Sequence, residues 1–301
     1  MPRDRWRGSV AIPMTPFDAQ DRIDEAALRA ELRFCIASHV GGIATPLMVS
    51  EFRLLSEEER RLMVRVAVEE CRGSGIPVVA NCAAVNTPLA VRYAEYAREV
   101  GADAVIAMPP YIHRPDWPTI RAYYQAISDA VDVPVWVQNA SLAPLSAEQI
   151  VELCSEIDNV SWVKEEVPPS THNISRLMAK RCPAVKGVMG GGGGRYLIAE
   201  RARGAAGVIH ACQFCDVVQR IWTLLDDGLQ EAAEELYERL LPNLMLEGLM
   251  GMAYAKEIMV RRGVLRNNRI RTEARPLDDE DLREIDRAWQ RIEPYLIWHA
   301  Q

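Results

Sequence analysis

Residues 135–165 read VWVQNASLAPLSAEQIVELCSEIDNVSWVKE, with a short apolar run at each end. The runs are Val135–Asn139 and Ser161–Glu165, each of a length typical of a β-strand. Between them, Ser146 precedes an acidic turn and a helical pattern, which indicates the start of a helix. A strand, a helix and a second strand in this order predict a parallel unit, because parallel strands need a crossover connection.

The same alternation recurs along the first three quarters of the chain. Helix starts are marked by Ser56 with Glu59, which form a capping-box pattern, and by Thr87-Pro88, which puts proline at a first helical position. Eight strand-and-helix units in about 215 residues predict a (β/α)8 TIM barrel, since an open doubly wound sheet has fewer strands. We expect the strands over Ser9–Met14, Gly42–Pro46, Pro77–Asn81, Ala104–Met108, Val135–Asn139, Ser161–Glu165, Val185–Met189 and Gly207–Ala211.

Beyond Asp216 the pattern is helical only. The expected helices are Asp216–Leu225, Leu229–Leu240, Met252–Arg262 and Asp279–Tyr295. The first closes the barrel, and the others form a helical appendage with apolar faces. We therefore predict a barrel over residues 1–228 and a C-terminal appendage over residues 229–301 that packs on it.

The composition and the apolar stretches argue against two classes of partner. The 301 residues include 35 Lys plus Arg against 42 Asp plus Glu, a net charge of −7, and 49% are hydrophobic. A nucleic-acid partner is not expected, because it requires a basic face. A membrane partner is not expected either, because the apolar stretch Ser9–Met14 is far shorter than the roughly 18 residues that span a bilayer. We expect a cytoplasmic protein.

The number of cysteines also suits a cytoplasmic protein. Their number is seven, which is odd and suits a reducing environment better than a disulfide framework. Cys212 and Cys215 have C-x-x-C spacing, but no second such pair or nearby histidine pair completes a zinc site. We predict no metal.

Lys164 is the outstanding candidate for chemistry. It stands at the end of the sixth expected strand, where catalytic groups of TIM barrels lie, although strands are depleted in charged residues. Apolar surroundings favour the neutral amine that attacks a carbonyl to form a Schiff base. The alternative is a structural lysine at the barrel rim, paired with Glu165 or Glu166. Glu166 shares a strand face with Lys164, where its carboxylate either holds the amine, steers a proton or is merely solvated.

Other strand ends supply further polar groups. Gln138, near the end of the fifth strand, donates and accepts hydrogen bonds but does not titrate. Ser50 and Glu51 follow the second strand, and Tyr111 lies in a proline-rich loop after the fourth. Five glycines, Gly190–Gly194, follow the seventh strand and precede Arg195. They are either a backbone cradle for a carboxylate or phosphate at a helix N-terminus, or a flexible lid.

Several segments together resemble the dihydrodipicolinate synthase and N-acetylneuraminate lyase family of Schiff-base lyases. The segments are Ala11–Phe17, Leu55–Arg60, Pro109–Tyr111 and Val163–Glu165. The resemblance implies a (β/α)8 barrel with C-terminal helices and Lys164 as the Schiff-base lysine. It also implies a homotetramer or other homo-oligomer, a small-molecule 2-keto acid substrate and no cofactor besides the covalent imine.

The chain departs from the family pattern at two places. The family's Gly-Thr-Thr-Gly-Glu segment reads Leu47-Met48-Val49-Ser50-Glu51 here, without both threonine hydroxyls. The tyrosine expected on the fifth strand, which relays protons in the synthase and the aldolases, is Gln138. Both departures make synthesis of the lysine precursor a poor fit. The pattern is more similar to the branch of 2-keto-3-deoxy-L-arabonate dehydratases, which act on 2-keto-3-deoxy sugar acids.

These features predict a lyase that dehydrates a 2-keto-3-deoxy sugar acid. Elimination requires removal of a C3 proton and protonation of the leaving hydroxyl. We expect Lys164, Gln138 and Glu166 to be catalytic, with a bound water or the amine itself moving the C3 proton. The expected substrate-binding residues are Val49, Ser50, Glu51, Tyr111, Gly191, Gly192 and Ile209.

Two alternatives stay open. One is a pyruvate-dependent aldolase in which Tyr111 or Glu166 replaces the lost base. The other is a non-catalytic ligand-binding homologue, favoured by the apolar Met48-Val49 pair.

Overall fold

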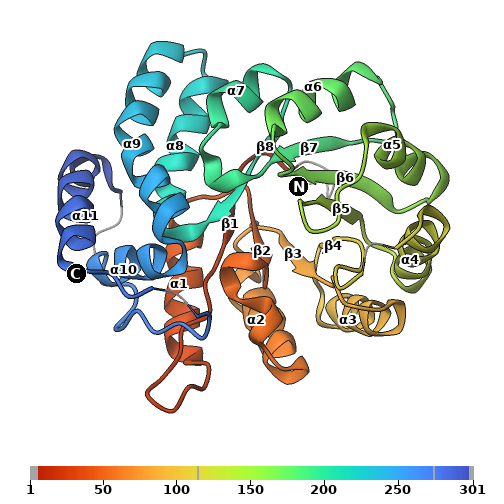
Figure 1. Ribbon diagram of the computed structural model, residues 1–301, viewed down its shortest axis with the longest axis horizontal. Helices are drawn as coiled ribbons and strands as arrows, with labels where there is room; N and C mark the ends of the chain where they lie inside the picture. Colours follow the sequence, from red (N-terminus) through yellow and green to blue (C-terminus); the bar gives the residue numbers. More distant parts are fainter. Residues whose placement is uncertain (1–5, 114, 274, 298–301) are drawn as a thin grey trace. The chain divides into compact units, whose positions relative to one another are not determined.

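The computed structural model describes residues 6–113, 115–273 and 275–297. Eight strands form a closed barrel in the order of the sequence, and the strand pairs with a recorded register are parallel (Figure 1). The predicted TIM barrel is thereby confirmed. The strands are β1 (Gly8–Ile12), β2 (Gly42–Thr45), β3 (Val78–Asn81), β4 (Ala104–Ala107), β5 (Val135–Asn139), β6 (Val160–Glu165), β7 (Gly187–Gly190) and β8 (Gly207–Ala211).

Helices follow the strands and continue past the last one. Ser56 and Glu59 form the predicted capping box, and Ser146 forms a second one with Gln149. The α-helices are α1 (Glu25–Ala37), α2 (Glu57–Cys71), α3 (Thr87–Val100), α4 (Trp117–Ala130), α5 (Ala147–Glu156), α6 (Ser170–Ala179), α7 (Leu197–Ala202), α8 (Cys215–Asp226), α9 (Gln230–Met250), α10 (Met252–Arg261) and α11 (Asp279–Ile292).

The chain divides into two compact units. Unit 1 comprises the described residues of 1–7, 77–192 and 196–209, and so contains β3–β7 and α3–α7. Unit 2 comprises the described residues of 8–76, 193–195 and 210–301, with β1, β2 and the C-terminal helices. The predicted division into residues 1–228 and 229–301 stays a prediction.

One helix is longer than the sequence pattern predicts. The helix expected over Leu229–Leu240 is α9, which runs on to Met250 with Pro242 inside it. Proline disfavours a helix interior, but packing stabilises the continuation. Leu244 is buried, and the Asn243 side chain donates to the Ala288 carbonyl of α11 at 3.0 Å and accepts from the Tyr254 hydroxyl at 2.7 Å.

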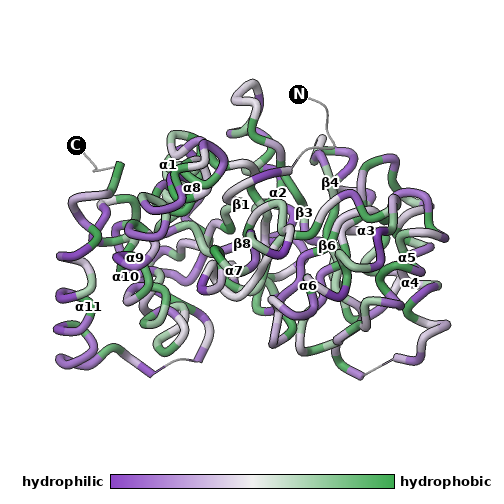
Figure 2. The backbone as a smooth tube through the Cα atoms, turned by 90° about the horizontal axis from the view of Figure 1, so that it is seen from above, coloured by the Kyte–Doolittle hydropathy of each residue, from purple (hydrophilic) through white to green (hydrophobic). Residues whose placement is uncertain are grey.

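The C-terminal helix α11 buries only one narrow row of side chains. In α11 the buried residues Asp281, Ile285, Ala288 and Ile292 recur at helical spacing, and the helix packs on α9. Hydrophilic and hydrophobic residues alternate along its turns in Figure 2. Among the described residues, no helix combines the length and the apolar character that crossing a membrane requires.

Candidate active site

Lys164 lies near the end of β6 and is buried, with 3% of its surface exposed. Its register neighbours are Gln138 on β5 and Met189 on β7. The opposite face of β6 carries Glu165, which bonds to Asn173 of α6. The helices therefore cover the Glu165 face, and Lys164 points to the inner face of the strands. This is the placement that the sequence predicts for it.

Glu166 and Gln138 surround the Lys164 amine. Lys164 Nζ lies 2.8 Å from Glu166 Oε2, and Gln138 Nε2 donates to Glu166 Oε1 at 2.6 Å. A carboxylate only accepts hydrogen bonds, so the amide nitrogen of Gln138 faces it. Gln138 Oε1 is buried and has no hydrogen-bond partner in the described structure. The three residues expected to be catalytic therefore form one group in unit 1.

Tryptophans fill the inner face on the N-terminal side of this group. The rings of Trp136 and Trp162 stack with centroids 5.1 Å apart, and Trp6 meets Trp136 edge-on at the same distance. Gly187 on β7 makes room for this stack, since a Cβ there would lie 2.3 Å from the Trp162 ring. Trp136 and Trp162 stand two residues before Gln138 and Lys164 on the same two strands.

Two carboxyl groups lie buried on the helix-facing side of unit 1. Glu165 accepts from Asn139 Nδ2 at 2.7 Å and from the Val167 amide at 2.9 Å, and burial raises its pKa to about 7. Glu200 on α7 accepts from the Ser170 hydroxyl at 2.8 Å. Burial, with a smaller contribution from the nearby Glu165, raises its pKa to about 7 as well. Sequence patterns gave no sign of this pair, because both residues sit among ordinary helix and strand positions.

The glycine run makes room for these side chains. A Cβ at Gly190 would lie 1.8 Å from Glu200 Oε2, and one at Gly191 would lie 2.3 Å from Glu166 Cβ. The helix that follows, α7, has six residues and begins at Leu197. Arg195, which follows the glycines, donates to the Leu244 carbonyl at 3.2 Å. Gly190 and Gly191 thus leave room for Glu200 and Glu166, and the predicted anion cradle or lid stays a prediction.

The turn after β2 belongs to unit 2 and is tied to the end of β1. Ser50 is fully buried, and its hydroxyl donates to the Pro13 carbonyl at 2.5 Å. The Ser50 amide donates to the Leu47 carbonyl at 3.0 Å, which closes the 3-10 turn Met48–Ser50. The amide of Val49 stands in the first turn, where intrahelical partners are lacking. The roles of Val49 and Ser50 in substrate binding stay predictions.

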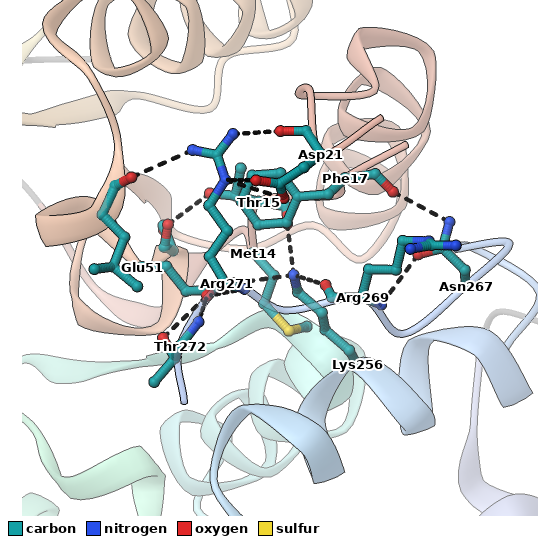
Figure 3. Close-up of polar contacts among 12 residues, drawn as sticks. Met14, Thr15, Phe17, Asp21, Glu51, Lys256, Asn267, Arg269, Arg271 and Thr272 are labelled. Carbon is teal, nitrogen blue, oxygen red and sulfur yellow. Dashed lines mark hydrogen bonds and ion pairs between the residues drawn. The ribbon is translucent and has the colours of Figure 1, made fainter. Parts of the chain in front are cut away.

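Glu51 binds groups of the chain itself (Figure 3). Its Oε1 lies 3.0 Å from Lys256 Nζ, and its Oε2 accepts from the amides of Arg271 and Thr272 at 2.8 and 2.7 Å and from the Thr272 hydroxyl at 2.9 Å. Both side chains of the Glu51–Lys256 pair are fully buried, and Lys256 also donates to the Thr15 and Arg269 carbonyls. Glu51 thus holds the segment 269–272, and its expected contact with substrate stays a prediction.

The remaining expected contacts lie in unit 1. Tyr111 is half-buried in the loop after β4, Ile209 is buried in β8, and Gly192 has a left-handed φ of 63°. Their roles in substrate binding stay predictions.

Comparison with known proteins gives the family. The model of the dihydrodipicolinate synthetase family matches residues 5–292, nearly the whole chain. The chain belongs to this family. A member from Azospirillum brasilense, L-2-keto-3-deoxyarabonate dehydratase, is 26% identical over 299 residues, which cover 97% of this chain and 96% of that one. The 4-hydroxy-tetrahydrodipicolinate synthase of Bartonella bacilliformis is also 26% identical, over 294 residues that cover 94% and 97%.

Solved structures of this dihydrodipicolinate synthetase family support the fold. The dihydrodipicolinate synthase of Rhodopseudomonas palustris superposes with a TM-score of 0.88 at 22% identity, and covers 96% of this chain and 98% of that one. The 4-hydroxy-tetrahydrodipicolinate synthase of Methylacidiphilum fumariolicum gives a TM-score of 0.88 at 21% identity, with 96% of each chain covered. The family consists of lyases, and the protein is a family member of the class I lyase type.

Proposed function

We propose that the protein is a Schiff-base-forming hydro-lyase that removes water from a 2-keto-3-deoxy sugar acid. The observation that carries the proposal is the Lys164, Glu166 and Gln138 group. It combines a buried amine, a carboxylate 2.8 Å from it and an unpartnered buried amide oxygen. Leaving a buried acceptor unpaired costs free energy, so Gln138 Oε1 favours a ligand that brings a hydroxyl donor. The similarity to the Azospirillum dehydratase supports the same substrate class.

Imine formation is the first step. Glu166 takes a proton from the Lys164 ammonium group, and the neutral amine adds to the C2 carbonyl of the substrate. The proton then passes from Glu166 to the hydroxyl of the adduct, which leaves as water. The products of this step are an iminium ion and the restored Glu166 carboxylate.

Elimination is the second step. The Glu166 carboxylate takes a C3 proton, and the electron pair of the broken C–H bond forms an enamine. The enamine expels the C4 hydroxyl, which receives the proton from Glu166 and leaves as water while Gln138 Oε1 holds it in place. Hydrolysis of the conjugated iminium releases an unsaturated 2-keto acid and restores the amine. Glu166 takes here the role first expected of a bound water or of the lysine itself, because its oxygen lies beside the amine.

Borohydride reduction tests the proposal. The protein is incubated with a panel of 2-keto-3-deoxy acids and with pyruvate, reduced, and examined by intact mass and peptide mapping. We expect an adduct on Lys164 whose mass corresponds to the dehydrated acid, and none in Lys164→Ala. Release of pyruvate from the panel would instead support an aldolase. A wild-type protein that forms no adduct with any 2-keto acid would support the ligand-binding homologue.

A further inference from the structure

The turn that carries Glu166 is fastened at four points. The Glu166 amide donates to the Asn139 carbonyl at 3.0 Å, and the Val167 amide donates to Glu165 Oε1 at 2.9 Å. Asn173 Nδ2 donates to the Val167 carbonyl at 2.9 Å. The fourth point is Ser170, whose hydroxyl donates to Glu200 Oε1 at 2.8 Å. The first three partners belong to β5, β6 and α6, whereas the fourth is supplied by α7.

Glu200 lies in a space made for it. Its side chain is fully buried, and Oε2 has no hydrogen-bond partner in the described structure. That oxygen lies against Gly190, where a Cβ would come within 1.8 Å of it. A buried carboxyl with one unsatisfied oxygen is destabilising by itself, and a leucine would fill a similar volume without this cost. The arrangement therefore points to a role for Glu200 besides packing.

We infer that Glu200 is a positioning residue, which acts through Ser170 to hold the turn of residues 166–170 and thereby keeps the Glu166 carboxylate beside the Lys164 amine. The inference rests on the proposed function, in which Glu166 moves the protons. Small displacements of a reacting group reduce rates steeply, because proton transfer requires hydrogen-bond distance. Glu200 itself touches neither the amine nor the substrate carbon atoms.

The charge of Glu200 adds a pH dependence. Glu165 on β6 is the titratable group whose charge acts on it, Glu166 in turn acts on Glu165, and the other neighbours with recorded contacts are the uncharged Ser170 of α6 and Gly190 of β7. With a pKa raised to about 7, Glu200 gains its negative charge as the pH rises through neutrality. The added charge lies behind the Glu166 turn and repels Glu165. We expect an inflection near pH 7 in the profile of kcat.

Two substitutions of Glu200 distinguish the effect of its hydrogen bond to Ser170 from the effect of its charge. Glu200→Gln retains an oxygen that accepts from Ser170 but removes the charge, whereas Glu200→Leu removes both. Glu31 offers a matched control, since it is fully buried, has one unpartnered oxygen and has a pKa raised to about 7, but belongs to α1 in unit 2. Glu31→Gln and Glu31→Leu are measured alongside. The readouts are kcat, KM, Lys164 trapping by borohydride, and hydrogen–deuterium exchange of the peptide that covers residues 166–170.

Glu200→Leu should lower kcat by about 10-fold to 100-fold, slow borohydride trapping of Lys164 and speed exchange in this peptide. Glu200→Gln should keep kcat within about 3-fold and slow exchange, but weaken the inflection near pH 7, to which Glu165 also contributes. Neither Glu31 variant should change hydrogen–deuterium exchange in the peptide that covers residues 166–170. Unchanged exchange at residues 166–170 in Glu200→Leu would overturn the inference, as would equal effects of the Glu31 variants. Absence of any adduct in the wild type would refute the proposed function, and exchange would still decide the positioning.

Discussion

In the proposed mechanism, the proton transfers in unit 1 depend on a single carboxylate. Glu166 contacts both Lys164 and Gln138, and Gln138 does not titrate. In Glu166→Gln the amide is similar in size but does not take a proton from C3. We expect turnover to fall by roughly 100-fold to 10,000-fold and borohydride trapping on Lys164 to slow, because Glu166 moves protons in both imine formation and elimination. Steady-state kinetics and intact mass measure the two quantities, and full turnover by Glu166→Gln would contradict this assignment.

The absence of a side chain at Gly191 leaves the room that Glu166 occupies. A Cβ at this position would lie 2.3 Å from Glu166 Cβ and 3.1 Å from the Glu165 carbonyl, and backbone atoms do not move aside easily. Gly191→Ala should therefore displace Glu166 and lower kcat, with smaller changes in the free energy of unfolding than in the rate. Gly194→Ala is the control, because no atom lies within 4 Å of its added Cβ, although its φ of +81° adds strain. Equal kcat losses in both variants would show that flexibility, and not space, matters.

At the scale of elements, helix α10 joins distant parts of unit 2 through Lys256. Its amine bonds to Glu51 after β2 and to the Thr15 carbonyl after β1, and desolvation lowers its pKa (Figure 3). Lys256→Met leaves the Glu51 carboxylate buried without its cation, which should cost about 3 to 5 kcal/mol of unfolding free energy. Urea unfolding measures this loss.

The double variant provides the control for this prediction. Lys256→Met with Glu51→Gln removes the stranded charge, so we expect it to be more stable than Lys256→Met alone. A single variant as stable as the double variant would mean that the stranded Glu51 charge is not what destabilises Lys256→Met.

The elements themselves could largely be predicted from the sequence. Strand β5 has the predicted bounds. Strand β6 begins one residue before its predicted start. The start of β7 was predicted two residues early, because the Val185 amide closes a turn with the Cys182 carbonyl instead of joining the sheet. Local sequence patterns indicate apolar runs and helix caps, but they do not show at which residue a turn ends and the hydrogen bonds of the sheet begin.

The candidate site could be predicted only in part. The period of two residues along a strand placed Lys164 and Glu166 on one face, and the structure confirms their contact. Glu200, Lys256 and the packing role of Gly190 stayed hidden, because their partners lie far away in the sequence. A charged residue inside an apolar helical stripe, such as Lys256 in α10, is the local signal from which its burial could have been predicted.

At the scale of the molecule, buried carboxyls set the pH dependence of stability. Burial raises the pKa of Glu31, Glu165 and Glu200 to about 7, above the ordinary value of 4.5. Between these values the folded state binds more protons than the unfolded state, so their contribution to stability is largest at low pH and falls as the pH rises. Buried His210 acts in the opposite direction, since desolvation lowers its pKa to about 4.

Glu31→Gln isolates one of these contributions. We expect the stability of this variant relative to the wild type to increase between pH 5 and pH 8 by up to about 3 kcal/mol, because the glutamine does not ionise. Unfolding free energies from urea titrations at several pH values provide the measurement. A difference independent of pH would mean that Glu31 ionises normally in the folded protein.

The packing along β7 has a consequence for divergence within the family. Gly187, Gly190 and Gly191 each lie where a Cβ would collide with one particular side chain, namely Trp162, Glu200 and Glu166. A relative that carries a larger residue at one of these positions has to carry a smaller or redirected side chain at its partner. The three pairs should therefore covary across homologous sequences, and the 190–200 and 191–166 pairs would mark which relatives share this arrangement of carboxyl groups.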